Sequence, residues 1–490
     1  MREAMMMYKT NPLFKFIAAL VLFVVDTLVV KLAYCRSNSS RRKRFWYTVV
    51  IGIILETVLG AFWLVNNHCE PVFDQKSIWE MGALIADGKG NTGDLSYFQI
   101  YPHQETLTLV ISVFVRVFRS GGLDAFQVFC LVCADLCLYW GAMIALRLSG
   151  QEKAGTMTLL FLLEFVSIFL YAKYVYGTLP SLCFSLGAFY FIVCWVQEHR
   201  LSHLLAGLAF TALMYIFYTG TLIAMIAIVV ILVLDAIQQN RTEKKSKLLS
   251  LTGSAIALII VLTILVSSGK IFTYKTELAD NSGMPATAWI LMGITSQSDY
   301  GAGGYDGSSV QLYQSCGENT ALTTAVTQGA IKEAIREYLD GRRPLYFFVD
   351  KTIAQWNDPW FNSLTMTINS VDKVQVLSST FTPAVLERID KALLALMNLG
   401  YLMSALYMAL QIRKREVKLE TLLLPLYFIG GFVFQLFWET KGRYCFPYYV
   451  CLLILAGIAT APLEQLLVRR FGTMRGKGKR EEKDSVQSSE

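Results

Sequence analysis

Long apolar segments dominate the pattern of hydrophobic and polar positions along the chain. A helix needs roughly 17–25 apolar residues to cross the hydrocarbon core of a bilayer. Eleven segments reach or approach this length, at about 13–34, 45–65, 124–146, 157–172, 178–196, 203–218, 219–237, 248–267, 391–411, 420–438 and 445–467. The pattern therefore predicts an all-α polytopic membrane protein with about eleven transmembrane helices, within a range of ten to thirteen because some segments are short.

A twelfth apolar segment, 104–118, is shorter and carries Arg116 and Arg119 at its end. We interpret it as an interfacial or re-entrant helix, with a full crossing as the alternative.

The basic residues favour the first interpretation. Short loops rich in Lys and Arg stay in the cytoplasm. All basic clusters fall on one side of the membrane if 104–118 does not cross, namely 41–44, Arg147 with Lys153, Arg200, 241–247, 413–418 and 469–483. This orientation places the C-terminus inside and the N-terminus outside, although Arg2, Lys9 and Lys15 near the N-terminus run against the rule.

The same topology divides the chain into four parts. An N-terminal transmembrane part, 1–267, contains a long outer loop at 66–123. A second outer insertion, 268–390, forms an extracytoplasmic cap. The C-terminal transmembrane helices follow at 391–470, and the charged, apolar-poor tail 471–490 is expected to be disordered in the cytoplasm.

The cap insertion contains helical patterns of its own. In 321–340, apolar Ile331, Ile335 and Leu339 recur every four residues, as on one face of an amphipathic helix. Gly341 is a stop signal for that helix, and Pro344 can begin another. The insertion is therefore predicted to be a small helical cap against the membrane face.

Composition agrees with a membrane protein and argues against nucleic-acid binding. Of 490 residues, 54% are hydrophobic and only 17% are charged, which leaves too little polar surface for a soluble domain of this size. The net charge of +7 arises mainly from the clusters beside the transmembrane segments, where Lys and Arg contact anionic lipid headgroups.

The first outer loop is acidic, and Asp74 is its most suggestive residue. It follows a membrane exit by about nine residues, in HCEPVFDQ, with an apolar flank. A carboxylate at the bilayer surface can act as a general base or bind a divalent cation. Glu105 is a further candidate metal ligand. Asp87 and Asp94 are more simply explained as solvated loop acids.

Three outer segments combine aromatic and charged residues. The segment YFQIYPHQ, 97–104, offers Tyr101, His103 and Gln104 to a sugar or acceptor, or anchors the chain at the interface. The turn WETKGRYCFPYY, 438–449, contains Glu439 and Arg443. Arginine binds phosphate in a bidentate manner, and an ordinary loop ion pair is the alternative.

The third of these outer segments is a tyrosine-rich turn, and the cap insertion supplies further candidate ligands. Lys173 lies in a tyrosine-rich turn, and Lys351 and Trp356 lie in the cap. The lysines suit phosphate and the tryptophan suits a sugar ring, but all three suit interfacial anchoring equally. The acids inside the apolar segments are scattered along the sequence and suggest no paired relay: Asp26, Glu56, Asp135, Glu164 and Asp235.

The order of these motifs resembles the GT-C superfamily of membrane glycosyltransferases. The resemblance covers most of the chain and rests on an Asp in the first outer loop, YP at 101–102, YVYG at 174–177 and E-x-x-x-R-Y at 439–444 with a following proline. WILMGI at 289–294, GGYDGSS at 303–309 and K-x-x-x-x-W-x-D-P at 351–359 are similar to the cap of Gram-positive members. The chain is most similar to the bacterial branch related to protein mannosyltransferases and lipid A aminoarabinose transferases.

The resemblance implies a reaction and a set of partners. Asp74 would activate the acceptor or help to bind a divalent cation, and Arg443, with Lys173 or Lys351, would hold the phosphate of the donor. Several relatives have a double acidic pair in this loop, whereas Gln75 follows Asp74 here, which leaves metal dependence open.

The expected enzyme moves a sugar from an undecaprenyl-phosphate carrier to a cell-envelope glycan, lipid or protein, on the outer face of a bacterial plasma membrane. The rival classes are a lipid-linked glycan transporter or flippase and a non-catalytic envelope assembly protein. A transporter predicts internal repeats and paired intramembrane charges, and no repeat is evident in the sequence.

Overall fold

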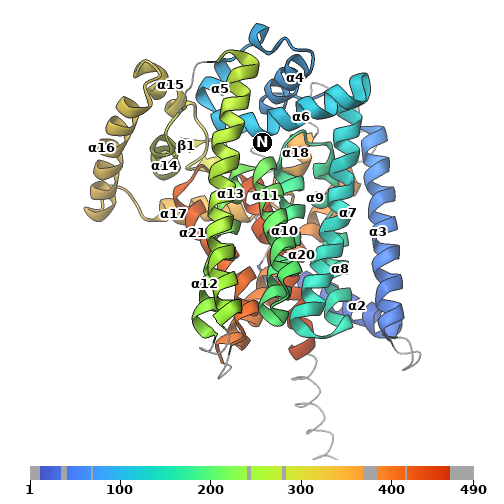
Figure 1. Ribbon diagram of the computed structural model, residues 1–490. Helices are drawn as coiled ribbons and strands as arrows, with labels where there is room; N and C mark the ends of the chain where they lie inside the picture. Colours follow the sequence, from blue (N-terminus) through green and yellow to red (C-terminus); the bar gives the residue numbers. More distant parts are fainter. Residues whose placement is uncertain are drawn as a thin grey trace, which may run out of the picture.

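The chain folds into a bundle of long helices, and only two two-residue strands accompany them among the described residues. The computed structural model describes residues 12–34, 41–67, 70–239, 244–278, 283–367, 383–413 and 417–463. The helices along the bundle (Figure 1) are α2 (Pro12–Tyr34), α3 (Arg41–Asn66), α7 (Gly122–Ser149), α8 (Glu152–Glu164), α10 (Thr178–Glu198), α11 (Leu201–Phe217), α12 (Leu222–Gln238), α13 (Lys244–Thr276), α20 (Pro383–Ile412), α21 (Leu423–Phe437) and the unlabelled helix Gly442–Leu463.

These helices confirm the prediction of an all-α, multi-pass membrane protein. Within the described residues, eight helices are long and apolar enough to cross a membrane, and the bent pair Glu152–Glu164 with Ser167–Lys173 makes a ninth. Two shorter apolar helices run with them, namely Ala19–Val30 within α2 and Leu201–Phe217, which is α11. Every one of the eleven predicted segments therefore has a helical counterpart. The predicted tail 471–490 lies outside the described residues.

The first insertion lies across the upper end of the bundle in Figure 1. It consists of α4 (Asp74–Ala86), η3 (Gly90–Thr92), α5 (Ser96–Ile100), η4 (Pro102–Gln104), α6 (Glu105–Phe118) and η5 (Arg119–Gly121). Helix α6 buries Leu107, Thr108 and Ile111 against α4 and leaves Val113 and Val117 exposed. It ends at Arg119, whose φ of 55° breaks the helix before α7. Helix α6 is joined to α7 in one candidate span, Pro102–Ser149, so its assignment as an interfacial helix stays a prediction.

The second insertion forms the cap at the left of Figure 1. It contains α14 (Ala286–Thr295), β1 (Gln297–Ser298), β2 (Gly301–Ala302), α15 (Ser308–Ser315), α16 (Thr320–Leu339), α17 (Tyr346–Trp356) and α18 (Ser363–Thr367). Strands β1 and β2 pair antiparallel, with Gln297 opposite Ala302. Helix α16 is capped by Asn319, the residue before it, whose side chain accepts a hydrogen bond from the N–H of Leu322 at 2.9 Å. It is followed by Gly341 with a φ of 73°, at the predicted stop signal.

The core of the bundle depends on close helix contacts. Helix α10 packs against α7, α11 and α12. A side chain at Gly187 would collide with the ring of Phe210, and one at Gly457 would collide with Thr158. Small residues at such crossings let membrane helices approach closely, where packing and hydrogen bonds hold them together.

The structure corrects one expectation about the acids inside the bundle. Asp26 of α2 and Glu164 of α8 are hydrogen-bonded to each other. Glu56 of α3 lies near Asp135 of α7, which accepts a hydrogen bond from Thr57 at 2.8 Å. Asp26 and Glu164 are therefore paired across helices, Glu56 and Asp135 are neighbours, and these acids are not scattered. Sequence spacing did not reveal the pairs because each joins residues on different helices.

Candidate active site

Asp74 and Arg443, which are 369 residues apart in sequence, meet at the upper end of the bundle. Asp74 is the first residue of α4, and Arg443 is the second residue of the helix Gly442–Leu463. Nη2 of Arg443 lies 3.4 Å from Oδ2 of Asp74. The carboxylate also stands at the N-terminal end of α4, where the helix dipole favours negative charge.

The backbone around Asp74 is held by its neighbours. Phe73, directly before the helix, has a φ of 51°, a region that costs a non-glycine residue free energy. Gln75 is buried, and its side chain accepts a hydrogen bond from the N–H of Val175 at 2.9 Å and donates one to the carbonyl of Met366 at 3.1 Å. Gln75 therefore fastens the start of α4 to the YVYG turn and to α18.

Arg443 is only 5% exposed and is held on several sides. Nη1 donates to the hydroxyl of Tyr174, and the guanidinium lies 5.3 Å from the ring centre of Tyr176 and 5.2 Å from that of Tyr444. Its backbone N–H donates to Oδ1 of Asn362 at 3.0 Å. Among the described residues, its Nε has no hydrogen-bond partner.

A cavity of about 840 Å³ begins at Arg443. Its polar lining comprises His103, Glu105, Tyr176, Arg443 and Tyr444, together with Ser181, Ser185, Ser268 and Gln435. Leu222 and Ile226 of α12 and Leu265 of α13 line its apolar part. These three side chains are 44–50% exposed on two candidate membrane spans. The cavity thus has charged and apolar walls, and the apolar walls belong to candidate membrane spans.

A row of aromatic rings borders the polar lining. Ring centres of Tyr97 and Tyr101 lie 4.9 Å apart, those of Tyr101 and Trp289 lie 5.8 Å apart, and those of Trp289 and Trp438 lie 6.0 Å apart. Tyr101 is also hydrogen-bonded to Tyr305 of the cap, and burial raises the pKa of both phenols above the ordinary value. Both hydroxyls therefore stay protonated at neutral pH.

The other predicted residues of the first loop and the last turn line the cavity or contact residues that line it. His103 and Glu105 line the cavity. The buried side chain of Gln104 donates to the hydroxyl of Tyr176. Glu439 is fully buried, accepts a hydrogen bond from Tyr444 at 2.9 Å and pairs with Lys441 at 2.7 Å. Glu439 therefore supports Tyr444, whose ring lies against Arg443.

Three predicted ligands have other surroundings. Nζ of Lys173 donates to Oε1 of Gln127 at 3.1 Å. Lys351 is fully buried and donates to the carbonyls of Gly293, at 2.7 Å, and Trp438. Trp356 packs against Phe428, Phe432 and Tyr448. None of the three lines the cavity. Because Trp438 does line it, Lys351 fixes a wall of the cavity from behind.

We expect Lys351→Met to loosen this wall. The substitution leaves two buried carbonyls without a donor, which costs about 2–4 kcal/mol of the free energy of unfolding. The apparent melting temperature of the purified protein in detergent should fall by several degrees. Lys332→Met, at an exposed position of α16, is the control and should leave it unchanged. Equal melting of both variants would show that Lys351 does not hold the wall.

The candidate metal ligands Asp74 and Glu105 do not belong to a larger ligand cluster. Within the described residues, no group of three or more His, Cys, Asp or Glu side chains is placed to hold a metal ion.

Several residues of the site were quoted in motifs without being assigned a role. Tyr174 and Tyr176 belong to YVYG, Trp289 to WILMGI, and Tyr444 follows Arg443 directly. Asn362 lies outside every quoted motif, and nothing in its surroundings in the sequence signals that it holds the backbone of Arg443.

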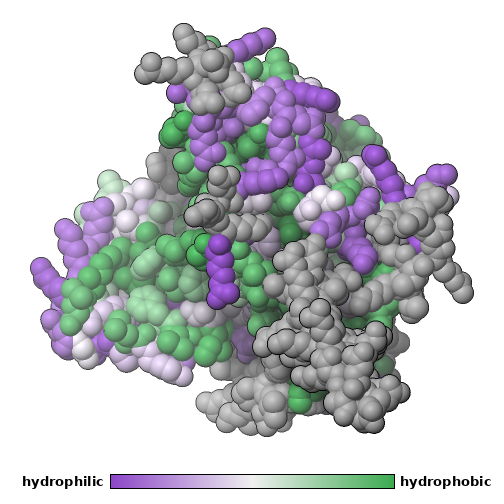
Figure 2. All heavy atoms as spheres, turned by 90° about the horizontal axis from the view of Figure 1, so that it is seen from below, coloured by the Kyte–Doolittle hydropathy of each residue, from purple (hydrophilic) through white to green (hydrophobic). Residues whose placement is uncertain are grey.

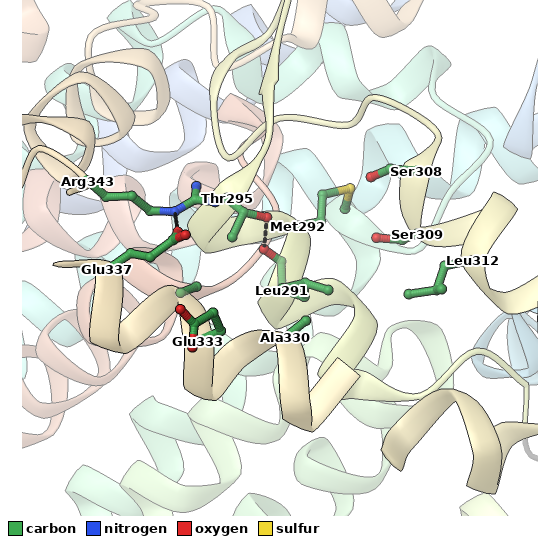
Figure 3. Close-up of a pocket in the computed structure, with 11 residues that line it drawn as sticks. Leu291, Met292, Thr295, Ser308, Ser309, Leu312, Ala330, Glu333, Glu337 and Arg343 are labelled. Carbon is green, nitrogen blue, oxygen red and sulfur yellow. Dashed lines mark hydrogen bonds and ion pairs between the residues drawn. The ribbon is translucent and has the colours of Figure 1, made fainter. Parts of the chain in front are cut away.

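A second cavity, of about 430 Å³, lies within the cap (Figure 3). Helix α14 contributes Leu291, Met292 and Thr295, α15 contributes Ser308, and α16 contributes Glu333 among others. Helix α14 also contributes Ala286 and Trp289 to the large cavity. This single helix therefore forms a wall of both cavities.

Comparisons with known proteins give distant structural similarities, which include two archaeal structures. No family model and no curated protein sequence matches the chain. The archaeal oligosaccharyltransferase AglB from Archaeoglobus fulgidus, in complex with an inhibitory peptide and a dolichol-phosphate, is similar with a TM-score of 0.43 and 10% identity, over 90% of this chain and 52% of that one. An Archaeoglobus fulgidus oligosaccharyltransferase tethered to an acceptor peptide is similar with a TM-score of 0.45 and 13% identity, over 87% and 50%. The chain spans about half the length of each, so the case for a reaction rests on the cavity.

Proposed function

We propose that this protein is a GT-C-type membrane glycosyltransferase. In this proposal it takes a sugar from an undecaprenyl-phosphate donor and transfers it to a glycan, lipid or protein of the cell envelope. The observation that carries the proposal is Arg443, which pairs with Asp74 and lines a cavity whose apolar walls belong to candidate membrane spans. A lipid phosphate has this same combination of a charged head and an apolar chain.

Arg443 is the proposed ligand of the donor phosphate. Its guanidinium lines the cavity, so a phosphate in the cavity can accept hydrogen bonds from it. Transfer breaks the bond between the anomeric carbon and the phosphate oxygen, so negative charge grows on the departing polyprenyl phosphate. A fixed guanidinium stabilises that growing charge more than it stabilises the donor.

Asp74 is the proposed general base. The acceptor hydroxyl attacks the anomeric carbon and must lose its proton, which passes to the carboxylate of Asp74. The pair distance of 3.4 Å is long for a charge-assisted hydrogen bond, so Asp74 is not tightly bound to Arg443. His103 and Tyr101, at the polar lining, are the proposed contacts of the sugar or acceptor.

The apolar part of the cavity is the proposed path of the polyprenyl chain. Ile226→Trp should narrow it and remove contacts equal to about two buried methylene groups, or ~1.5 kcal/mol. The KM for a long-chain donor should rise roughly tenfold, and that for a short-chain analogue should change little. Ile237→Trp, at an exposed position lower on α12, is the matched control. An equal effect on long and short donors would contradict this path.

The orientation of the chain supports an outer active site. The helix ends that carry the basic residues Arg44, Arg147, Arg200, Lys247 and Arg413 gather at the lower end of the bundle, opposite Asp74 and Arg443. The positive-inside rule then assigns the lower end to the cytoplasm. The proposed location is a bacterial plasma membrane, with the active site facing outward.

A lipid-linked glycan transporter is the second candidate, because Asp26 and Glu164 are paired inside the bundle and Glu56 lies near Asp135. Reconstitution into vesicles with a fluorescent lipid-linked sugar separates the two. A transferase releases polyprenyl phosphate and glycosylates an acceptor, whereas a transporter moves the intact lipid to the other leaflet. Movement without release, lost in Glu56→Gln and kept in Asp74→Asn, would establish the transporter.

A further inference from the structure

Helix α17 of the cap has an apolar face that no described residue covers. Leu345, just before it, and Val349 and Ile353 within it are 67%, 47% and 51% exposed. Their spacing of four residues places them on one side of the helix. The opposite side, with Phe347, Lys351 and Gln355, is buried against the protein. In water, an amphipathic helix exposes its polar side, whereas the exposed side of α17 is mainly apolar and has the exposed Asp350 at its edge.

This helix lies along a candidate membrane span. The ring centre of Phe348 is 6.4 Å from that of Phe437, and the ring centre of Trp356 is 5.7 Å from that of Phe428. Phe437 and Phe428 are nine residues apart on α21, or about 13 Å at the helical rise per residue. One leaflet of the hydrocarbon core is about 15 Å thick. Two side chains of α17 therefore contact positions on α21 that are spaced by most of the depth of a leaflet.

The exposed face of α17 is continued by apolar residues of α21. Ile429, Val433 and Phe437 are about half exposed and belong to the candidate span Leu419–Phe437. Seen from below, hydrophobic residues gather over the cap lobe at the left of Figure 2. The exposed apolar face of α17 is therefore at the level of a candidate membrane span.

After α17, the chain returns to the upper end of the bundle, where Arg443 lies. After Trp356, Asn362 reaches the backbone N–H of Arg443. Farther on, the carbonyl of Thr367 in α18 accepts a hydrogen bond at 3.0 Å from the side chain of Asn67, which follows the upper end of α3. The irregular stretch between α17 and α18 includes Phe361, which is fully buried. Irregular backbone at membrane depth is tolerated where protein surrounds it.

We propose that residues 346–367 form a re-entrant membrane segment, in which α17 enters the cap-side leaflet with its Val349 and Ile353 face against lipid acyl chains. The entry is bordered by charged residues that pair with one another, Arg342 with Glu333 at 3.1 Å and Arg343 with Glu337, as suits the headgroup level. The returning limb brings Asn362 and Met366 to Arg443. Part of the cap thus belongs to the membrane domain and supports the cavity from within the leaflet.

Collision measurements on spin labels test this placement. Single cysteines are introduced by Val349→Cys and Ile353→Cys in a full-length protein whose Cys35, Cys69 and Cys316 are replaced by serine. Gln314→Cys, at an exposed polar position of α15, is the control. The labelled proteins are reconstituted into phosphatidylcholine vesicles. Oxygen concentrates in the hydrocarbon, and a nickel chelate stays in water.

At Val349 and Ile353, oxygen should relax the label several-fold more than the chelate, with the larger ratio at Ile353, which lies nearer the deep end. At Gln314 the order should reverse. Relaxation by the chelate at both test positions would place the face in water. Labels that are immobile and reached by neither reagent would show that a second protein surface covers it. Either result overturns the proposal, and none depends on glycosyl transfer, because no substrate is present.

Discussion

Asp74→Asn is expected to reduce sugar transfer by about 10²–10⁴-fold, the usual contribution of a positioned general base. The amide has nearly the same shape as the carboxylate but cannot accept the proton of the acceptor hydroxyl. The variant should keep its donor affinity, because the neutral amide leaves the guanidinium of Arg443 in place and removes a negative charge beside the phosphate. Initial rates with purified protein and a lipid-linked donor measure the effect.

Asp87→Asn is the matched control for this variant. Asp87 follows the same helix, α4, at its other end and is exposed, so its substitution should leave the rate unchanged. A melting temperature close to that of the wild type would show that Asp74→Asn is folded. Wild-type turnover in a folded Asp74→Asn protein would remove Asp74 from the chemistry.

Arg443→Ala is expected to weaken donor binding by ~2–5 kcal/mol, the usual range for truncating a buried charged partner. The physical reason is the loss of a planar group that donates several hydrogen bonds to one phosphate. Arg443→Lys keeps the charge but not this geometry, and it should recover only part of the affinity. Titration of a fluorescent polyprenyl-phosphate donor measures the binding.

Arg343→Ala controls for the loss of a guanidinium elsewhere. Arg343 pairs with Glu337 in the cap and contacts the smaller cavity, so its loss should leave donor affinity unchanged. Unchanged affinity in a folded Arg443→Ala protein would refute the phosphate assignment. Because Arg443 also touches Tyr174 and Asn362, the melting temperature must be recorded beside the affinity.

The membrane fold could be predicted from the sequence because each span carries its signal within its own residues. Apolar length alone indicates a helix that crosses, as at 178–196 and 391–411, where α10 and α20 lie. The pairing of Asp26 with Glu164 could not be predicted in this way, since it depends on which helices are neighbours. The proposed position of α17 within a leaflet has no sequence signal either, because eleven residues are too few to indicate a membrane segment by length.

The candidate site, like the fold, could be predicted from the sequence only in part. Asp74 and Arg443 were selected from outer segments by their residue types and by the order of motifs, and the structure brings them together. Lys351 was selected on the same grounds, but its side chain points to two carbonyls on the far side of a cavity wall. Side-chain direction within a short helix depends on tertiary packing, which a single sequence does not display. Asn362 acts through its contact with a backbone N–H, and no residue pattern announces such a contact.

The most direct test of the proposed function is the release of polyprenyl phosphate by the purified protein. Vesicles containing the protein are supplied with undecaprenyl-phosphate sugars of several kinds and with candidate acceptors, and the lipid products are separated by mass. We predict release of undecaprenyl phosphate in step with acceptor glycosylation, for at least one donor, and its loss in Asp74→Asn. Donors that stay intact with every sugar and acceptor, while the folded protein binds them or moves them across the bilayer, would contradict the proposal that the cavity is a glycosyltransferase site.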